Sequence, residues 1–184
     1  MIRLVIVVTA ALVFAGAAVA DVPPGMILEP VISARAAWVA HKPVTIYCAS
    51  TNDAWAAYID SVGTPSDFPN GAASAFGYTP TDGGTTSYLA PATCAPILKR
   101  IARATPSFLA LGATLDVLTV ESLHLRGEVD DGQTACDALK VLPGFLVAKW
   151  GFRRGGPAYV QVLRGAYNYH ALQTAAQYHT GPCG

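Results

Sequence analysis

Glu121 and His124 are the residues of this sequence whose types and spacing come closest to a recognised chemistry. They lie in the stretch Val120-Glu121-Ser122-Leu123-His124. Zinc hydrolases carry H-E-x-x-H on a helix, where both histidines bind the metal and the glutamate accepts a proton from metal-bound water. Catalytic zinc takes three protein ligands and keeps one position open. Val120 stands where the first histidine would be, so one ligand is missing from the pattern.

A metal site at this helix would therefore need ligands from elsewhere in the chain. Asp131 is a candidate because it lies at the start of the next expected helix. The third ligand would be a distal histidine, and Glu121 would be the general base. The candidate histidines are His41, His170 and His179. The sequence does not show that these side chains converge, so a non-standard ligand set is an alternative to an absent metal.

Other catalytic classes have less support. The sequence has no G-x-S-x-G segment, so it lacks the usual nucleophile turn of serine hydrolases. Ser122 and His124 are two residues apart, which points their side chains to different faces of a helix. A di-metal carboxylate site would need a second E-x-x-H segment, and the sequence has none.

The charge of the chain is balanced, with 12 Lys+Arg against 12 Asp+Glu. Nucleic acids and anionic membranes bind proteins through clustered positive charge, so neither is expected as the main partner. One basic cluster, formed by Lys149, Arg153 and Arg154 around Trp150, is interpreted as a solvated turn.

The first 20 residues have the features of a signal peptide. Arg3 precedes an unbroken apolar run, which ends in Ala18-Val19-Ala20, the small-x-small pattern that signal peptidase accepts. We expect cleavage after Ala20. Residues 21–184 would then form a single secreted or extracytoplasmic domain with no stable membrane anchor.

Four cysteines follow this segment, and an even number in an exported chain indicates two disulfides. Three pairings are possible. We favour Cys48–Cys94 and Cys136–Cys183, which would link an N-terminal half and a C-terminal half of the domain. If all four cysteines are paired, none is left as a nucleophile or as a metal ligand.

The hydrophobic pattern places Glu121 and His124 on a long apolar helix. Ser107 suits the cap at its start, and Gly127 suits the position just past its end. The whole pattern predicts an α+β fold, mostly helical with a small antiparallel sheet. The expected elements are a strand at 43–48, a helix at 50–63, a hairpin over 75–90, and helices at 91–104, at 108–125, from 130 to an end or kink near Pro143, and at 157–178.

The segment VESLHLRGEVDDGQTACDAL, with GYTPTDGGTTSYLAPATCAPIL upstream, resembles a group of exported actinobacterial proteins related to small zinc metallopeptidases. That group is expected to carry H-E-x-x-H-x-x-G and then an acidic helix start, D-E-x-x-x-E-C. The resemblance spans Val44 to Leu139. It rests on the order of a cysteine, a T-x-Y-L-x-P-x-x-C segment, the E-x-x-H-x-x-G helix and a further cysteine. It implies a zincin-like domain around the central helix.

The departures from this pattern fall on the functional positions. Val120 replaces the first histidine, Asp131 replaces the first glutamate of the acidic helix, and Ala135 stands where the second glutamate would be. The retained residues are Glu121, His124, Gly127 and Cys136. The resemblance therefore implies that the scaffold is kept while the metal site is dismantled.

Three hypotheses follow. The favoured one is a secreted, disulfide-stapled, zincin-like domain with a degenerate metal site. It would be a non-catalytic binding or cell-envelope protein with no cofactor and an unknown protein or envelope ligand. The second is an active metallohydrolase or peptidase in which His124, Asp131 and a distal histidine hold zinc. The third is a purely structural exported domain.

Overall fold

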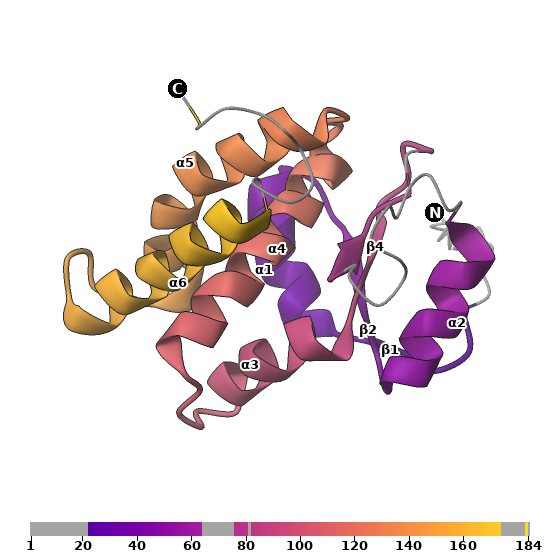
Figure 1. Ribbon diagram of the computed structural model, residues 1–184, viewed down its shortest axis with the longest axis horizontal. Coiled ribbons are helices and arrows are strands. Elements are labelled where there is room, and N and C mark those ends of the chain that lie inside the picture. Colours follow the sequence, from indigo (N-terminus) through magenta and orange to yellow (C-terminus); the bar gives the residue numbers. More distant parts are fainter. Residues whose placement is uncertain (1–21, 64–75, 81, 174–182, 184) are drawn as a thin grey trace, which may run out of the picture.

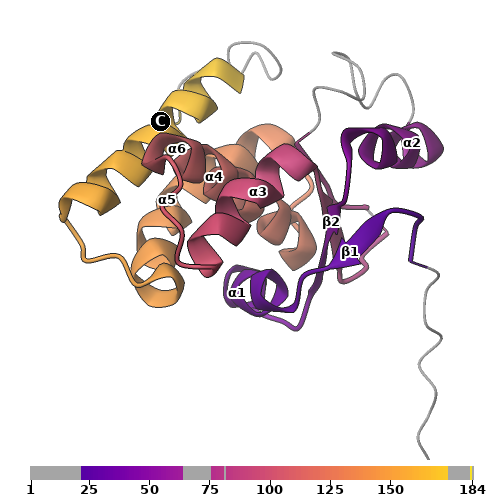
Figure 2. The ribbon, with the colours of Figure 1, turned by 90° about the horizontal axis from the view of Figure 1, so that it is seen from below.

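The computed structural model of the chain describes residues 22–63, 76–80, 82–173 and 183, which form a small sheet with helices on both of its faces (Figures 1 and 2). The strands are β1 (Met26–Leu28), β2 (Thr45–Ala49), β3 (Gly77–Tyr78) and β4 (Thr86–Leu89). The helices are α1 (Pro30–Ala40), α2 (Asn52–Val62), α3 (Pro91–Ile101), α4 (Phe108–Arg126), α5 (Asp131–Trp150) and α6 (Pro157–Gln173). The predicted α+β class, mostly helical, is confirmed.

The sheet has the strand order β1-β2-β4-β3. β2 and β4 are parallel, while β1 pairs with β2 and β3 pairs with β4 in the antiparallel sense. The sheet is therefore mixed, and the expectation of an antiparallel sheet is wrong for its central pair. The reason is the connection: α2 intervenes between β2 and β4, and such a crossover returns the chain in its original direction. β3 forms an edge of the sheet and contacts α4.

Side-chain alternation along the strands produces two hydrophobic cores. Ile46, Cys48 and Leu89 turn to the face that is covered by α1, α3 and α4 and belong to the larger core. Tyr47 and Tyr88 turn to the opposite face, where they pack with α2 in a smaller, aromatic core. Figure 2 shows α2 on one side of the strands and α1, α3 and α4 on the other.

α4 is the central helix of the larger core and contacts α1, α3, α5 and α6 (Figure 1). Most of its residues are buried. As predicted, Ser107 caps its first turn by accepting a hydrogen bond from the Ala110 amide, and Gly127 ends it with a φ of 113°. Gly112 allows close contact with α6, because a Cβ there would lie 2.0 Å from the Val162 carbonyl oxygen. α4 is the one described helix that is long and apolar enough to cross a membrane. However, 67% of its apolar stretch is buried inside the protein, as expected for a core helix.

Two further differences separate the prediction from the fold. β1 and α1 were not predicted, although α1 buries Ile32, Ala36 and Val39 at helical spacing. Of the end or kink expected near Pro143, the end is wrong, because α5 continues to Trp150 and its buried apolar face holds it in the core despite the proline. α6 is described to Gln173, so the expected end at Tyr178 lies outside the described residues.

Both disulfides form with the favoured pairing. Cys48–Cys94 joins β2 to α3, and Cys136–Cys183 joins α5 to the C-terminal end of the chain. No cysteine is free. Two disulfides are compatible with a protein that folds in an oxidising, extracytoplasmic compartment.

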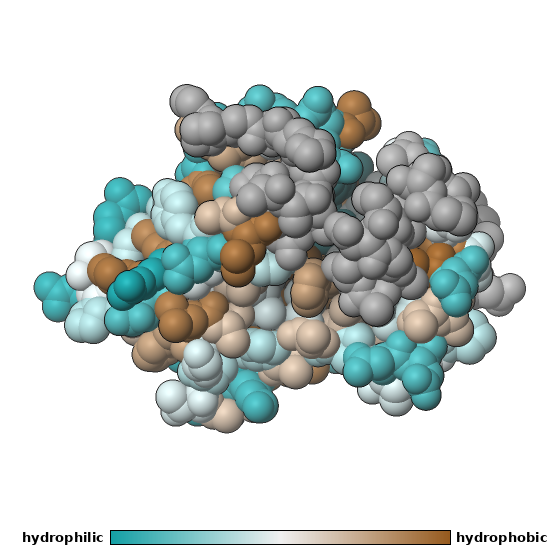
Figure 3. All heavy atoms as spheres, viewed as in Figure 1, coloured by the Kyte–Doolittle hydropathy of each residue, from teal (hydrophilic) through white to brown (hydrophobic). Residues whose placement is uncertain are grey.

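The surface carries mixed side chains. Over the helical part of the face in Figure 3, hydrophobic groups are small and are separated by hydrophilic ones. Val160 and Leu172 of α6 are 51% and 72% exposed. The coloured part of this face therefore gives no indication of a broad apolar docking surface.

Candidate functional site

Glu121 and His124 lie in the last turns of α4, beside the sheet edge and the start of α5. The Glu121 side chain is only 7% exposed. The backbone of β3 lies directly against it, because a Cβ on Gly77 would be 2.5 Å from the Glu121 Oε1 atom. A residue with a side chain would displace this carboxylate, so the close approach requires glycine at position 77.

A single hydroxyl group holds the Glu121 carboxylate from the sheet side. Thr79 Oγ1 donates a hydrogen bond to Glu121 Oε2 at 2.6 Å. Burial raises the pKa of Glu121, while the nearby His124 and the Thr79 hydrogen bond lower it and the charge of Asp131 raises it. The net pKa is raised, because desolvation of the carboxylate is the largest of these effects.

The His124 ring is fixed between α4 and α5. Its Nδ1 atom lies 2.7 Å from the Glu128 carbonyl oxygen. A carbonyl only accepts hydrogen bonds, so Nδ1 carries the proton. Its Nε2 atom faces Asp131 Oδ1 at 3.4 Å. The left-handed turn at Gly127 brings the Glu128 carbonyl back toward the ring.

The structure therefore brings Glu121, His124 and Asp131 into one cluster, together with Thr79, which the sequence analysis did not select. Thr79 is 42 residues from Glu121 along the chain, and no spacing pattern links the two. Only part of the cluster is accessible to solvent. The side chains of His124 and Asp131 are 18% and 62% exposed, whereas Glu121 is buried behind β3.

A mononuclear zinc site does not fit the described residues around His124. Val120, one turn before His124, is half-buried and packs against the larger core, and Ala135 is buried. His124 and Asp131 supply two donor atoms, and catalytic zinc requires a third. Among the described residues, the group of three ligand-type side chains whose donor atoms converge is Cys136, His170 and Cys183, which excludes His124.

The two described distal histidines, His41 and His170, do not complete the set. His41 is an exposed residue in the left-handed conformation at the end of α1. His170 lies beside the second disulfide, with its Nε2 atom 3.3 Å from Cys183 Sγ, and its burial lowers its pKa. His179 lies outside the described residues. The sulfur atoms of Cys136 and Cys183 are bonded to each other, so they are not thiolate ligands in the oxidised protein.

The serine within the motif is also unavailable for catalysis. Ser122 is fully buried and donates its hydroxyl hydrogen to the Leu118 carbonyl oxygen at 2.6 Å. Of the motif residues and their described neighbours in the cluster, His124 and Asp131 are the pair that reaches solvent, whereas Glu121 and Ser122 are buried.

No protein-family model, curated protein or solved structure matches this chain. Its description therefore rests on its own residues: a disulfide-stapled α+β domain with a Glu–His–Asp cluster in which Glu121 is buried and Asp131 is exposed. The resemblance to small zinc metallopeptidases stays a prediction.

Proposed function

We propose that this protein is a secreted, non-catalytic domain in which a metallopeptidase-like helix has kept Glu121 and His124 as structural links. The observation that carries the proposal is that both residues are engaged inside the protein. Glu121 accepts the Thr79 hydrogen bond, and His124 lies between the Glu128 carbonyl and Asp131. The position that would hold the first zinc ligand is an apolar side chain against the core.

These contacts would let the cluster stabilise the packing of the sheet edge, α4 and α5 against one another. The Thr79–Glu121 bond joins the edge of the sheet to α4, and the His124 contacts join α4 to the start of α5. Hydrogen bonds that involve a charged group typically contribute about 1.5 to 3 kcal/mol to stability. Glu121 and His124 would then be retained without a metal, because their loss would weaken the packing of the sheet edge, α4 and α5.

We further propose that the protein acts outside the cytoplasm and binds a partner there. The N-terminal segment has the features of a signal peptide that is cleaved after Ala20, and both disulfides support an extracytoplasmic location. A secreted domain without catalysis would act by binding, and its partner would be a protein or another component of the cell envelope.

Two substitutions at His124 separate a structural role from a metal-binding role. An asparagine amide can donate to the Glu128 carbonyl as Nδ1 does, whereas alanine cannot. We therefore expect His124→Asn to retain much of the unfolding free energy that His124→Ala loses. Excess zinc or a chelator should not change the unfolding free energy of the unchanged chain or of either variant. Urea unfolding measures this. A zinc-dependent gain in stability that both substitutions abolish would contradict the proposal.

The alternative is an active metallohydrolase with a non-standard ligand set. One observation favours it: metal-binding histidines commonly donate their second ring nitrogen to a backbone carbonyl, as His124 does to Glu128. In that alternative Glu121 is the general base, and zinc binding would have to draw a third ligand toward His124 and Asp131. The same unfolding experiment with zinc distinguishes the two candidates.

A further inference from the structure

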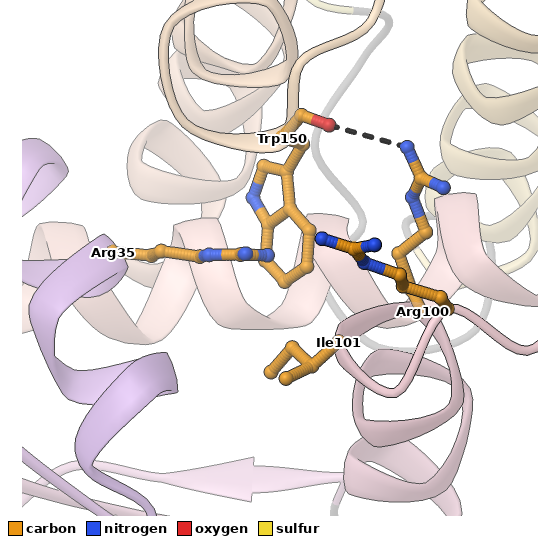
Figure 4. A pocket seen from close by; sticks show the side chains of 5 residues that line it. Arg35, Arg100, Ile101 and Trp150 are labelled. Atoms are coloured by element: carbon orange, nitrogen blue, oxygen red, sulfur yellow. Dashed lines mark hydrogen bonds between the residues drawn. The ribbon is translucent and has the colours of Figure 1, made fainter.

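A basic hollow lies away from the Glu121–His124 cluster, between α1, the end of α3 and the end of α5. Its volume is about 410 Å³. It is lined by Arg35, Arg100, Ile101, Arg103 and Trp150, and Figure 4 shows Arg35 reaching from α1 to the Trp150 indole. Three of its five lining residues are arginines and none is acidic, so the hollow has the charge of an anion site.

Aromatic faces hold two of the guanidinium groups in place. The Arg35 guanidinium carbon lies 3.9 Å from the centre of the Trp150 ring. The Arg100 guanidinium lies 5.0 Å from the centre of the Phe152 ring, and its Nη2 atom donates to the Trp150 carbonyl oxygen at 3.4 Å (Figure 4). Stacking on rings reduces the freedom that an arginine loses when it binds a ligand, so these groups are preorganised.

The third arginine is placed by an unusual turn. Arg103 follows α3 and has a φ of 59°, the left-handed conformation that residues with a side chain rarely adopt. Its amide donates to the Arg100 carbonyl oxygen at 3.2 Å, which closes the turn. The turn places Arg103 at the wall of the hollow together with Arg100.

No carboxylate balances this charge within the described part of the chain. Its ion pairs are His124–Asp131, Arg126–Glu128 and Lys140–Asp137, and none involves the arginines of the hollow. Burial and the neighbouring Arg100 both lower the pKa of Arg35, and no acidic group opposes them. Three like charges that converge in a partly buried hollow oppose folding, and a bound anion would relieve their repulsion.

We propose that this hollow binds a phosphate group, carried by inorganic phosphate or by a phosphate monoester. The planar guanidinium fork matches two phosphate oxygens at once, and a dianion offsets more of the positive charge than a single carboxylate does. The Trp150 ring holds the Arg35 guanidinium at the wall of the hollow, which favours this binding geometry. The site is independent of the role proposed for the Glu121–His124 cluster.

Sequence analysis did not find this site because its residues come from distant segments. The basic residues near Trp150 in sequence are Lys149, Arg153 and Arg154, which are all exposed. Instead, Arg35 of α1 stacks on the indole, and Arg100 of α3 donates to the Trp150 carbonyl oxygen. The exposed pair Arg153 and Arg154 therefore provides a control with the same change of charge.

The test is calorimetric titration of the exported, disulfide-bonded chain at fixed ionic strength. The ligands are inorganic phosphate, glycerol 3-phosphate and succinate. The proteins are the unchanged chain, Arg100→Gln with Arg103→Gln, and the control Arg153→Gln with Arg154→Gln. We expect one saturable phosphate site per chain, a loss of affinity of at least about tenfold in the first double variant, and unchanged affinity in the control.

The titrations also identify the source of the phosphate group. Tighter binding of glycerol 3-phosphate supports a monoester ligand, and equal binding supports the free ion. The proposal is overturned if neither phosphate ligand binds saturably, if the control variant loses as much affinity as the first variant, or if succinate binds more tightly. Should the double variant fail to fold, Arg103→Gln alone serves the same comparison, because Arg103 is exposed at the end of α3.

Discussion

Asp116 is a buried carboxyl group in the middle of the central helix, and replacing it should make the protein more stable at neutral pH. It is 2% exposed, and its Oδ1 atom has no hydrogen-bond partner among the described residues. Burial raises the pKa of Asp116 from the ordinary value of 3.8 to about 8. The folded protein therefore holds a proton on this group at neutral pH, where the unfolded chain has released it.

The sign and size of the effect follow from this difference in pKa. Between pH 3.8 and about 8 the folded state binds one more proton than the unfolded state, so the free energy of unfolding falls as the pH rises. The slope is about 1.4 kcal/mol per pH unit, which amounts to about 4 kcal/mol between pH 3.8 and pH 7. Asp116→Asn keeps the size of the side chain and cannot ionise, so it should remove this loss.

Urea unfolding of both proteins from pH 4 to pH 8 measures the effect. We expect the stability of Asp116→Asn relative to the unchanged chain to increase steadily over this range, by about 4 kcal/mol at pH 7. Asp137→Asn is the control, because hydrogen bonds from Gln133 and Lys140 lower the pKa of Asp137 and give a small change of opposite sign. Parallel pH profiles for Asp116→Asn and the unchanged chain would refute the reasoning.

Two further substitutions test the packing around α4. Thr79→Val removes the hydrogen bond to Glu121 at nearly constant volume, so it should raise the pKa of Glu121 further and lower the unfolding free energy by about 1 to 3 kcal/mol in urea titrations. Gly112→Ala would place a Cβ 2.0 Å from the Val162 carbonyl oxygen and should lower the melting temperature, with a loss of about 1 to 3 kcal/mol or more. Gly144→Ala is its control, because its Cβ would meet only an ordinary contact at 3.5 Å and the change should be neutral or stabilising.

The features that the sequence predicted are of two kinds. Helix caps depend on residues within one turn, and the disulfide pairing had only three alternatives. Ser107 and Gly127 bound α4 as expected, because caps act within one helical turn. The helix expected at 50–63 likewise begins beside a local cap, because Thr51 accepts a hydrogen bond from the Ala54 amide at the start of α2. The disulfide pairing was one choice among three, and it formed as favoured.

The features that the sequence did not predict depend on contacts between distant segments. The parallel pairing of β2 with β4 follows from how the chain crosses over, which strand patterns do not encode. Thr79 meets Glu121 only because the sheet edge lies on α4. The hollow likewise joins Arg35 to residues of α3 and α5. Asp131 was selected only as a candidate ligand, without evidence that it approaches His124, and the structure places the two side chains 3.4 Å apart.

The central claim is that the helix carrying Glu121 and His124 no longer holds a catalytic metal. The most direct measurement is zinc per chain by mass spectrometry, after dialysis against equimolar zinc and desalting. The chain is kept oxidised, so that Cys136 and Cys183 offer no thiolates, and His124→Ala is measured beside it. The account predicts zinc far below one ion per chain in both proteins. Near-stoichiometric zinc that disappears in His124→Ala would contradict it.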